Sequence, residues 1–481
     1  MKKILYILLT SFILFSCEDM LTEEPKSIST DTFYNTPKEI ESALGAIYSA
    51  VRDYNCMGGL YPAQLNAYTD YDYGRGSYAV LTTFKGLEGN NINRVGQMWD
   101  KFYLGIRNAN IVIKNVPNGA KLTEADKTKY MAEAKFMRAL IYFTMVKNWA
   151  GVPIRTEENM SVIEIKRNSA EEVYQFILTD LQFAEANLPE TPALIGKPTK
   201  WAAKTLIADI YFYQGKNTEA RDKAKEVIQS NKFALVPVAT PADFTKLFGP
   251  DVVNTTEEIF YLKFYRSPGQ GWGLPIFGHR AGDGHYGGGG YYALYSDAEK
   301  NSVIKAWDKN DMRWLYGWYK YDIGLGANTI LNSKFDDLKA AADQAGNDFP
   351  LYRYADLLLL YAEADCRASN GPTTDALEKL NMVHRRAYGK PALVPDATVD
   401  FKLADYNKDS FIELVIRERG YETQFEVKRW HDLKRTGTVK ERILAATGQV
   451  VAEKHLLWPI PVSELNYNKA IDPSKDQNPG Y

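Results

Sequence analysis

The chain has 481 residues, which is too long for one small core and predicts about three ordinary domain units or one large composite domain. Hydrophobic residues make up 45% and charged residues 25%, a balance that excludes disorder over most of the length. The 58 Lys and Arg nearly cancel the 60 Asp and Glu, giving a net charge of −2. A nucleic-acid-binding protein usually carries a basic excess, so we expect no nucleic-acid partner.

The first 16 residues have the pattern of a secretory signal peptide. Two lysines precede an apolar run from Ile4 to Phe15, which is too short to span about 30 Å of hydrocarbon as a helix. The run ends in Leu14-Phe15-Ser16-Cys17, which resembles a bacterial lipobox. We therefore expect cleavage after residue 16 and lipidation of Cys17, including a palmitate chain, so that the remaining 17–481 are tethered to a membrane. The alternative is a plain secreted protein with a cysteine at this position by chance.

Acidic residues follow Cys17 at once, as in the surface-export signal of some Gram-negative lipoproteins. They predict an outer-membrane, surface-exposed location. Two further cysteines, Cys56 and Cys366, cannot make a disulfide scaffold. Cys366 follows an apolar helical run, so we favour buried free thiols, although a bond between the two stays open.

Most of the remaining chain carries helical patterns. Thr36-Pro37-Lys38-Glu39 is typical of a capped helix start, and Phe136 to Val146 is apolar on nearly every side, which predicts a helix that is buried all round. Helices are predicted from Pro37 to about Arg52, over 97–115, from Thr123 onward, from Ser169 to near Leu188, and over 200–213, 217–229, 353–369 and 374–388. The pair 200–213 and 217–229 meets at a short glycine turn with small facing residues, like a tetratricopeptide unit. The prediction is a mainly α fold of degenerate, tetratricopeptide-like helical pairs.

Two aromatic-rich segments, near 54–96 and 261–321, interrupt the helices. The second carries 15 aromatic residues in 61 positions, about twice the 13% of the whole chain. Glu258 to Phe264 is short, apolar and strand-like, so a few short strands are expected beside these loops. Long irregular segments inside a compact domain are usually functional. We therefore treat 17–481 as a single composite domain whose ligand region lies in these insertions.

The cofactor and metal motifs in the sequence lack the surrounding residues or structure that such sites need. Gly282-x-Gly284-x-x-Gly287 is followed by three more glycines, which disfavours the helix that a dinucleotide site needs. Asp70-x-Asp72-x-Gly74 has Leu81 where a calcium loop needs Glu, so only a looser Ca²⁺ site stays open. His279, Asp283 and His285 could meet around a metal, but a glycine-rich loop holds no register, and exposed loop residues are favoured. We expect no cofactor, no bound metal and no catalytic residue.

A charged string near the C-terminus has two interpretations. Opposite charges recur at i, i+4 spacing among Glu413, Arg417, Glu418, Arg419, Glu422, Glu426, Arg429, Asp432 and Arg435. A catalytic cluster is one interpretation, and an ion network that locks a helix is the favoured one. Glycosidase carboxylate pairs have no sequence string of their own, so a hydrolase is not excluded by pattern alone.

Several of these strings together resemble the SusD/RagB family of nutrient-binding lipoproteins. The matching segments are Glu133-Ala134 with Phe136-Met137-Arg138-Ala139, Gly196-Lys197-Pro198-Thr199-Lys200, Arg353-Tyr354-Ala355-Asp356, Arg429-Trp430, and the ending Gln477-Asn478-Pro479-Gly480-Tyr481. The resemblance covers almost the whole chain. It implies a helical surface lipoprotein that is not an enzyme, binds oligosaccharides or other nutrients, and passes them to a SusC-like TonB-dependent outer-membrane transporter. The alternatives are a surface-anchored glycan hydrolase and a peptide-capturing helical-repeat module.

The two irregular segments supply the candidate ligand-binding residues. A sugar presents C–H faces to aromatic rings and hydroxyls to polar groups, so a site should combine both. The candidates are Asn66, Tyr68, Asp70, Tyr71, Tyr73 and Arg75 from the first segment, and Trp272, His285, Tyr286, Tyr291, Tyr292 and Trp314 from the second. Tyr291 and Tyr292 follow a glycine run that we expect to be flexible, so at least one of them should be exposed.

Overall fold

The computed structural model describes residues 33–87 and 90–481; the predicted signal peptide and Cys17 lie outside this range. The long helices are α2 (Pro37–Arg52), α5 (Asn90–Asn115), α6 (Glu124–Trp149), α7 (Ala170–Asn187), α8 (Lys200–Tyr213), α9 (Asn217–Gln229), α13 (Tyr354–Ala368), α14 (Thr374–Ala387) and α15 (Lys408–Glu422). Within the described ranges no helix is both long and apolar enough to cross a bilayer. The mainly α prediction is confirmed.

Shorter elements lie between the long helices. The short helices are α3 (Leu60–Ala67), α4 (Ala79–Thr82), α10 (Thr245–Phe248), α11 (Ser302–Ala306), α12 (Met312–Gly317), α16 (Arg429–Arg435), α17 (Val439–Thr447), α18 (Val462–Tyr467) and α19 (Pro473–Asp476). The strands are β1 (Tyr73–Gly74), β2 (Glu258–Leu262), β3 (Leu294–Asp297), β4 (Trp318–Lys320), β5 (Thr329–Asn332) and β6 (Phe349–Arg353). They form an antiparallel sheet of order β1-β3-β5-β4 and an antiparallel β2-β6 pair.

The helix ends follow the local sequence. Thr36 and Glu39 make the predicted capping box at the start of α2, and Ser169 with Glu172 makes another at the start of α7. Asn407 caps α15. A helix whose first N–H groups are satisfied by its own cap needs little help from elsewhere at that end, which is why these starts could be predicted from short motifs.

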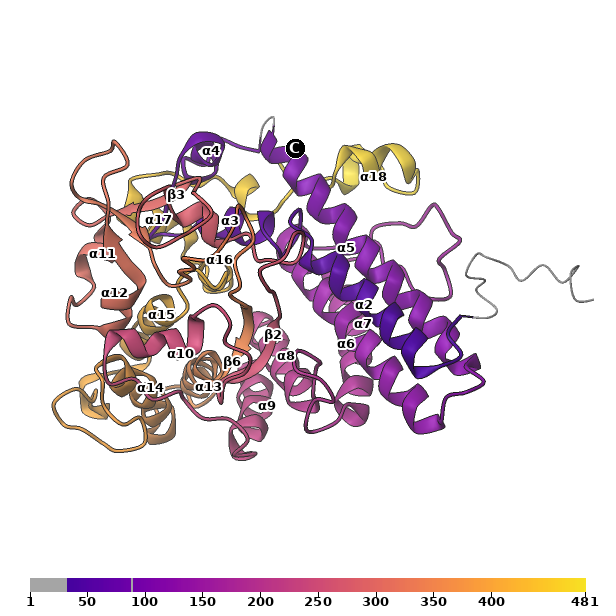
Figure 1. Ribbon diagram of the computed structural model, residues 1–481, viewed down its shortest axis with the longest axis horizontal. Coiled ribbons are helices and arrows are strands. Elements are labelled where there is room, and N and C mark those ends of the chain that lie inside the picture. The colour runs from indigo at the N-terminus through magenta and orange to yellow at the C-terminus, as the bar shows by residue number, and fades with distance from the viewer. Residues whose placement is uncertain (1–32, 88–89) are drawn as a thin grey trace, which may run out of the picture.

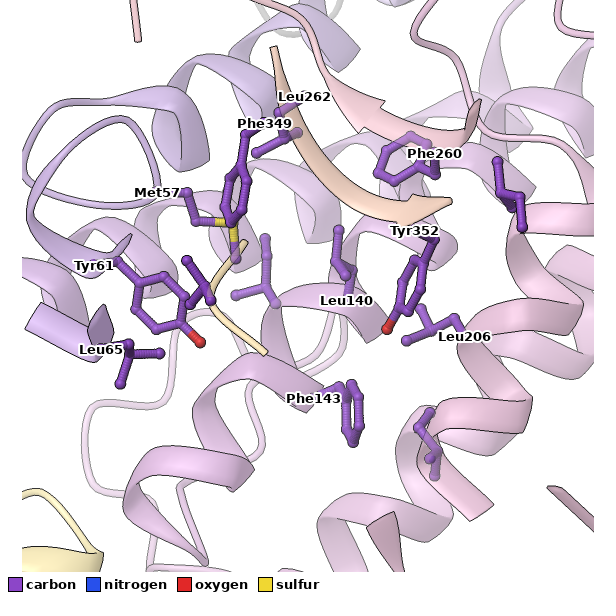
Figure 2. Packing of buried hydrophobic residues seen from close by; sticks show 14 of the residues in the cluster. Met57, Tyr61, Leu65, Leu140, Phe143, Leu206, Phe260, Leu262, Phe349 and Tyr352 are labelled. Atoms are coloured by element: carbon purple, nitrogen blue, oxygen red, sulfur yellow. The ribbon is translucent and has the colours of Figure 1, made fainter. Parts of the chain in front are cut away.

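Helix α6 lies at the centre of the core. Every residue from Phe136 to Val146 is buried, as its all-round apolar pattern predicted. It packs against α5 on one side and α7 on the other, and these helices lie side by side in Figure 1. Side chains from α3, α6, α8, β2 and β6 meet in one cluster, with Tyr61, Leu140 and Tyr352 among those labelled in Figure 2. The predicted pair α8–α9 packs against α13, which in turn packs on α14 and α15.

A buried ion network joins these helices to the loop-rich half of the molecule. Arg353, where β6 meets α13, contacts Glu426 twice, at 2.7 and 2.8 Å, and Glu422 at 2.5 Å. Arg386 of α14 bonds Glu422 and Glu257, and all five side chains are 1% exposed or less. A charge can be buried at tolerable cost only when it is fully paired, so each member of this network needs the others.

The charged string does form an ion network, as the favoured interpretation predicted, but that network does not lock a single helix. The carboxylate of Glu422 pairs with Arg353, Arg386 and Arg313, which come from three other elements, and not with a residue one turn away. Asp432 does pair with Arg435 on its own helix, but it also binds Arg419 of α15. The string therefore holds separate elements together, because most partners of its carboxylates are distant in sequence.

The two cysteines of the described chain are free. Cys56 and Cys366 are both completely buried, and burial raises the pKa of the Cys366 thiol to about 11. A thiol with a raised pKa and no solvent access reacts slowly, so both behave as small core residues.

Glu422→Ala tests the ion network. The change leaves three buried arginines short of an acceptor, so we expect a loss of about 3–5 kcal/mol in the free energy of unfolding, measured with urea. Burial opposes ionisation of Glu422, but the arginines outweigh it and hold the pKa of this carboxyl far below its usual range. The network is therefore fully formed above about pH 4.3 and is lost as the pH falls toward the lowered pKa, so wild-type stability should decline in acid.

Glu413→Ala is the matched control for the same helix. Glu413 makes an exposed ion pair with Arg442, and its side chain is 57% exposed. Exposed pairs contribute about 0–1 kcal/mol, so its removal should barely shift the urea midpoint. Equal losses in the two variants would contradict the network.

Candidate functional site

Strand pairing brings the two predicted ligand segments together. In the β1–β3 ladder Tyr73 lies opposite Tyr295 and Gly74 opposite Leu294. The pairing continues for one more residue, because the Arg75 N–H donates to the carbonyl of Ala293 at 2.8 Å. Side chains two apart on a strand point to the same face, so Tyr73 and Arg75 share one side of this ribbon.

Four tyrosines on this ribbon and its approach, Tyr73, Tyr291, Tyr292 and Tyr295, form what we call the tyrosine surface. Tyr291 is 50% exposed and the other three are partly exposed. The rings of Tyr73 and Tyr295 lie 5.5 Å apart, and Tyr291 meets the buried Phe277 edge to face at 5.4 Å. Each ring is thus held on one side by protein and open on another, which is the arrangement that a stacking ligand requires. The expected exposure of Tyr291 is confirmed.

The glycine run before these tyrosines is closely packed and not free, contrary to our expectation. A Cβ at Gly290 would lie 2.0 Å from the carbonyl oxygen of His279, and one at Gly287 would lie 2.3 Å from that of Leu338. The glycines therefore let this loop lie directly on its neighbours. The packing also explains why Tyr292 can keep a left-handed φ of 35°, which is costly for a bulky residue unless the surroundings enforce it.

Three of the predicted residues from the first segment belong to the interior. Asn66 is fully buried and donates to the carbonyl of Pro62 at 2.8 Å. Both carboxylate oxygens of Asp70 accept from Arg429, at 2.8 and 2.6 Å. Tyr71 is 2% exposed and packs in a small cluster around Trp307 and Trp318. A side chain that is enclosed in the interior of the protein cannot present its polar groups to a ligand.

Three further candidates are also buried. Tyr68 packs its ring 5.0 Å from that of Trp430, and Trp272 stacks at 5.2 Å on Phe349 of β6 with no exposed surface. Tyr286 is 4% exposed and donates to a backbone carbonyl. These six predicted residues therefore lie in the interior and not on a surface, because aromatic-rich loops of this length need a core of their own and these side chains form it.

Trp314 is partly exposed but lies in a separate cluster. Its ring is covered by the Lys309 ammonium at 3.3 Å and meets Trp307 edge to face at 5.9 Å. No contact between Trp314 and the tyrosine surface is found among the residues that the structure describes. Of the twelve predicted positions, the structure therefore brings together Tyr73, Arg75, Tyr291 and Tyr292.

His285 belongs to a cluster next to the glycine run. The His285 Nδ1 lies 2.5 Å from Asp336 Oδ2, and its ring stacks on that of Tyr319 with centroids 3.8 Å apart. The Tyr319 hydroxyl donates to Asp283 Oδ2 at 2.7 Å and lies 3.1 Å from His279 Nδ1. His279, Asp283 and His285 do meet, although their sequence gave no reason to expect a fixed register.

This cluster is a hydrogen-bonded set and does not have the arrangement of a metal site. Over residues 33–87 and 90–481, no group of three or more His, Cys, Asp and Glu side chains is placed to hold a metal ion. The oxygens of Asp283 accept backbone N–H groups of the loop as well as the Tyr319 hydroxyl. The looser Ca²⁺ site near Asp70 loses its main ligand to Arg429, which binds both carboxylate oxygens.

A hollow of about 450 Å³ lies away from the tyrosine surface, beside the helical pairs. It is lined by Trp201 at the start of α8, Phe233, and residues of β2 such as Glu258. Its position next to α8 separates it from the aromatic loops, and its lining includes none of the predicted ligand residues. We therefore centre the candidate site on the tyrosine surface.

Sequence reasoning missed three residues at this site: Arg280, Tyr295 and Tyr319. Tyr295 could have been found only with the strand register, which sets it opposite Tyr73. Tyr319 lies on β4, which is separated from β1 by the two strands β3 and β5, and Arg280 lies in an irregular loop. No short-range periodicity links these positions, so only the folded sheet brings them together.

Comparisons with known proteins agree along the chain. A family model described as "Starch-binding associating with outer membrane" matches residues 20–212, and one described as "SusD family" matches residues 284–481. SusD-like protein P25 from Formosa agariphila is 24% identical over 99% of each chain. A SusD homologue from Bacteroides thetaiotaomicron superposes with a TM-score of 0.80 at 24% identity, over 94% of this chain and 98% of that one. A structure titled "Laminarin binding SusD-like protein" superposes with a TM-score of 0.72 at 23% identity, over 93% of this chain and 100% of that one. At these identities the structural likenesses establish the fold.

Asp336→Asn tests the electrostatics of the His285 cluster. Burial lowers the pKa of His285, but the hydrogen bond and charge of Asp336, with the charge of Asp283, outweigh it and raise the pKa above its usual 6.5. Removing the Asp336 charge should lower the pKa of His285, as measured by NMR titration. His455 is the control in the same spectrum, because burial and Lys454 lower its pKa without any part played by Asp336.

The same pair links stability to pH. Because the folded-state pKa of His285 is raised, its contribution to stability is present below about pH 6.5 and disappears as the pH rises through the raised value. His285→Gln should therefore cost more stability at pH 6 than at pH 8.5. An unchanged cost between these two pH values would contradict the ion pair.

Proposed function

Because the chain belongs to the SusD/RagB family, we propose that it is a non-catalytic, cell-surface protein that binds oligosaccharides or related nutrients and passes them to a TonB-dependent outer-membrane transporter. The observation that carries the binding role is the tyrosine surface. It offers partly exposed rings that are anchored from below, and arginine donors lie beside them. Related proteins titled as laminarin-binding and as surface glycan-binding support the ligand class.

The geometry suits a sugar chain better than a buried small molecule. Sugar C–H faces can lie on Tyr73 and Tyr291, while ring hydroxyls bond to Arg75 and to the hydroxyl groups of neighbouring tyrosines. An open surface can also accept a polymer that continues in both directions, which a closed pocket cannot. We also propose that the helical pairs, whose packing is regular, and not the aromatic loops, face the transporter or frame the fold.

We further propose that Cys17 carries the lipid that tethers the protein to the outer membrane. The support is the lipobox-like sequence at residues 14–17 and the outer-membrane association in the description of the matched family model. Stable anchoring needs more than one acyl chain, which a lipidated N-terminal cysteine supplies.

Alanine replacement at the tyrosine surface tests the binding role. Wild-type protein should bind an oligosaccharide from a glycan array in a saturable isotherm without release of cleaved sugar. Tyr73→Ala and Tyr291→Ala should each weaken that binding by about 2 kcal/mol, or roughly thirtyfold, because each removes a stacking ring. Their melting temperatures should stay close to wild type, since both rings are partly exposed.

Trp272→Ala is the stability counterpart of these variants. Its ring is completely buried, so its loss should cost about 3–5 kcal/mol of stability. Wild-type affinity in both tyrosine variants would place the ligand elsewhere, and the hollow lined by Trp201 would be tested next. Turnover of the bound sugar would favour the hydrolase alternative.

Cys17→Ala tests the anchor. The variant should fold normally and move from the membrane fraction to the soluble fraction of cells that lack the partner transporter. A Cys56→Ala variant is the control, because Cys56 is a buried thiol of the folded domain and its loss should leave membrane association unchanged. Full membrane retention of Cys17→Ala would contradict lipidation at this residue.

A further inference from the structure

Two arginines lie over the ring of Tyr292. The guanidinium carbon of Arg75 is 4.0 Å from the ring centroid, and that of Arg280 is 5.5 Å from it. Arg75 extends from the end of β1, and Arg280 comes from the loop that precedes the glycine run. The two come from segments 205 residues apart, so their convergence is a property of the fold.

Neither guanidinium has an ion pair or a hydrogen bond within residues 33–87 and 90–481. Arg266, in the same aromatic-rich region, shows the usual alternative: it binds both Asp251 and Asp337 at 2.7 Å. A guanidinium that lies over a ring keeps its N–H donors, which point outward in its own plane. Both arginines are therefore positioned, charged and unused.

The nearby carboxylates are hydrogen-bonded to other groups and form no ion pair with either arginine in the described ranges. Asp283 receives the backbone N–H of Arg280 and the hydroxyl of Tyr319 on one oxygen, and the backbone N–H of His285 on the other. Asp322 accepts successive N–H groups of its own loop. Both carboxylates are thus engaged with backbone N–H groups. Asp322 lies close enough to Arg280 for their charges to interact, but neither carboxylate occupies the guanidinium N–H donors of the arginines.

The backbone holds Tyr292 in place under these arginines. Its φ of 35° is unusual for a bulky residue, and its N–H donates to the carbonyl of His279 at 2.8 Å. Strained conformations persist where the surroundings enforce them, and they concentrate at binding sites. Gly290 leaves no room for a side chain against His279, so close backbone packing holds Tyr292 in this conformation.

We propose that the tyrosine surface takes an anionic oligosaccharide, with a carboxylate or sulfate group of the sugar bound by Arg75 and Arg280. This inference rests on the proposed function and narrows its ligand class. Planar guanidinium groups donate two parallel hydrogen bonds to such oxyanions, which is stronger and more selective than binding of a hydroxyl. The partly exposed rings of Tyr73 and Tyr291, on the same ribbon and its approach, would take the uncharged faces of the same chain.

Paired probes test the charge of the ligand directly. Binding of the full-length Cys17→Ala protein is measured by calorimetry with oligogalacturonate, alginate and carrageenan oligosaccharides. Each is compared with its carboxyl-reduced or desulfated counterpart, and laminarin oligosaccharides serve as the neutral reference. At least one acidic probe should bind about tenfold or more tightly than its neutralised counterpart, and its affinity should fall as NaCl is raised. The first two probes report carboxylate recognition and the third reports sulfate recognition.

Arginine variants then test whether Arg75 and Arg280 cause the preference for acidic probes. Arg75→Gln and Arg280→Gln should each weaken the acidic probe about tenfold while changing neutral probes little, and Arg75→Lys should restore only part of the loss. Arg107→Gln is the matched control, because Arg107 is an exposed arginine of α5 that lies near Tyr34. Melting temperatures within a few degrees of wild type exclude a folding defect.

The outcomes separate this inference from the proposed function. Equal affinity for acidic and neutralised probes, or a preference that survives in both Gln variants, overturns the anionic ligand while oligosaccharide binding stands. If neutral oligosaccharides bind and acidic ones do not, the anionic ligand is also overturned while oligosaccharide binding stands. If no probe binds and the glycan array is also silent, both the inference and the proposed function fail.

Discussion

The arrangement of the molecule depends on one constraint, which is that the buried charge of Arg353 must be compensated. This residue lies where β6 meets α13, so its partners decide how the loop-rich half is attached to the helical half. Glu422, at the end of α15, and Glu426, in the turn after it, bond directly to the guanidinium. Because a buried unpaired charge costs several kcal/mol, few other relative placements of these elements are accessible.

A second buried pair extends this constraint to the candidate site. Arg429 of α16 binds Asp70, and Asp70 lies only three residues before Tyr73. The segment that enters β1 is thereby attached to the C-terminal helices, and β1 pairs with β3. β3 lies against α3, and in Figure 1 it is far from α7 and α6. The tyrosine surface is therefore built on a framework that is held by buried ions.

The surface itself combines rigidity with unused chemistry. Its glycines allow close backbone packing, its rings rest on Phe277 and on each other, and Arg75 has no carboxylate partner within the described ranges. Preorganised groups of this kind bind with little ordering cost, because the side chains are already in place. Arginine charges are paired with carboxylates in the core, whereas Arg75 at the tyrosine surface has no such partner in the described ranges. This difference separates the framework from the candidate site.

The sequence by itself was enough to predict the helices and the family, because both depend on short-range sequence patterns. Capping boxes, the all-apolar stretch of α6 and the glycine turn between α8 and α9 act over a few residues, so the starts at Pro37, Ala170 and Lys200 could be predicted. The sequence also indicated the two segments that supply the candidate site. It could not separate a ring that packs a loop from a ring that stays exposed, since Trp272 and Tyr291 both lie in the same aromatic-rich segment. Tertiary structure decided that question, and it also decided the pairing of Asp70 with Arg429 and the approach of Arg75 and Arg280 to the ring of Tyr292. These contacts join residues hundreds of positions apart, and their energies depend on burial and register, which exist only in the folded chain.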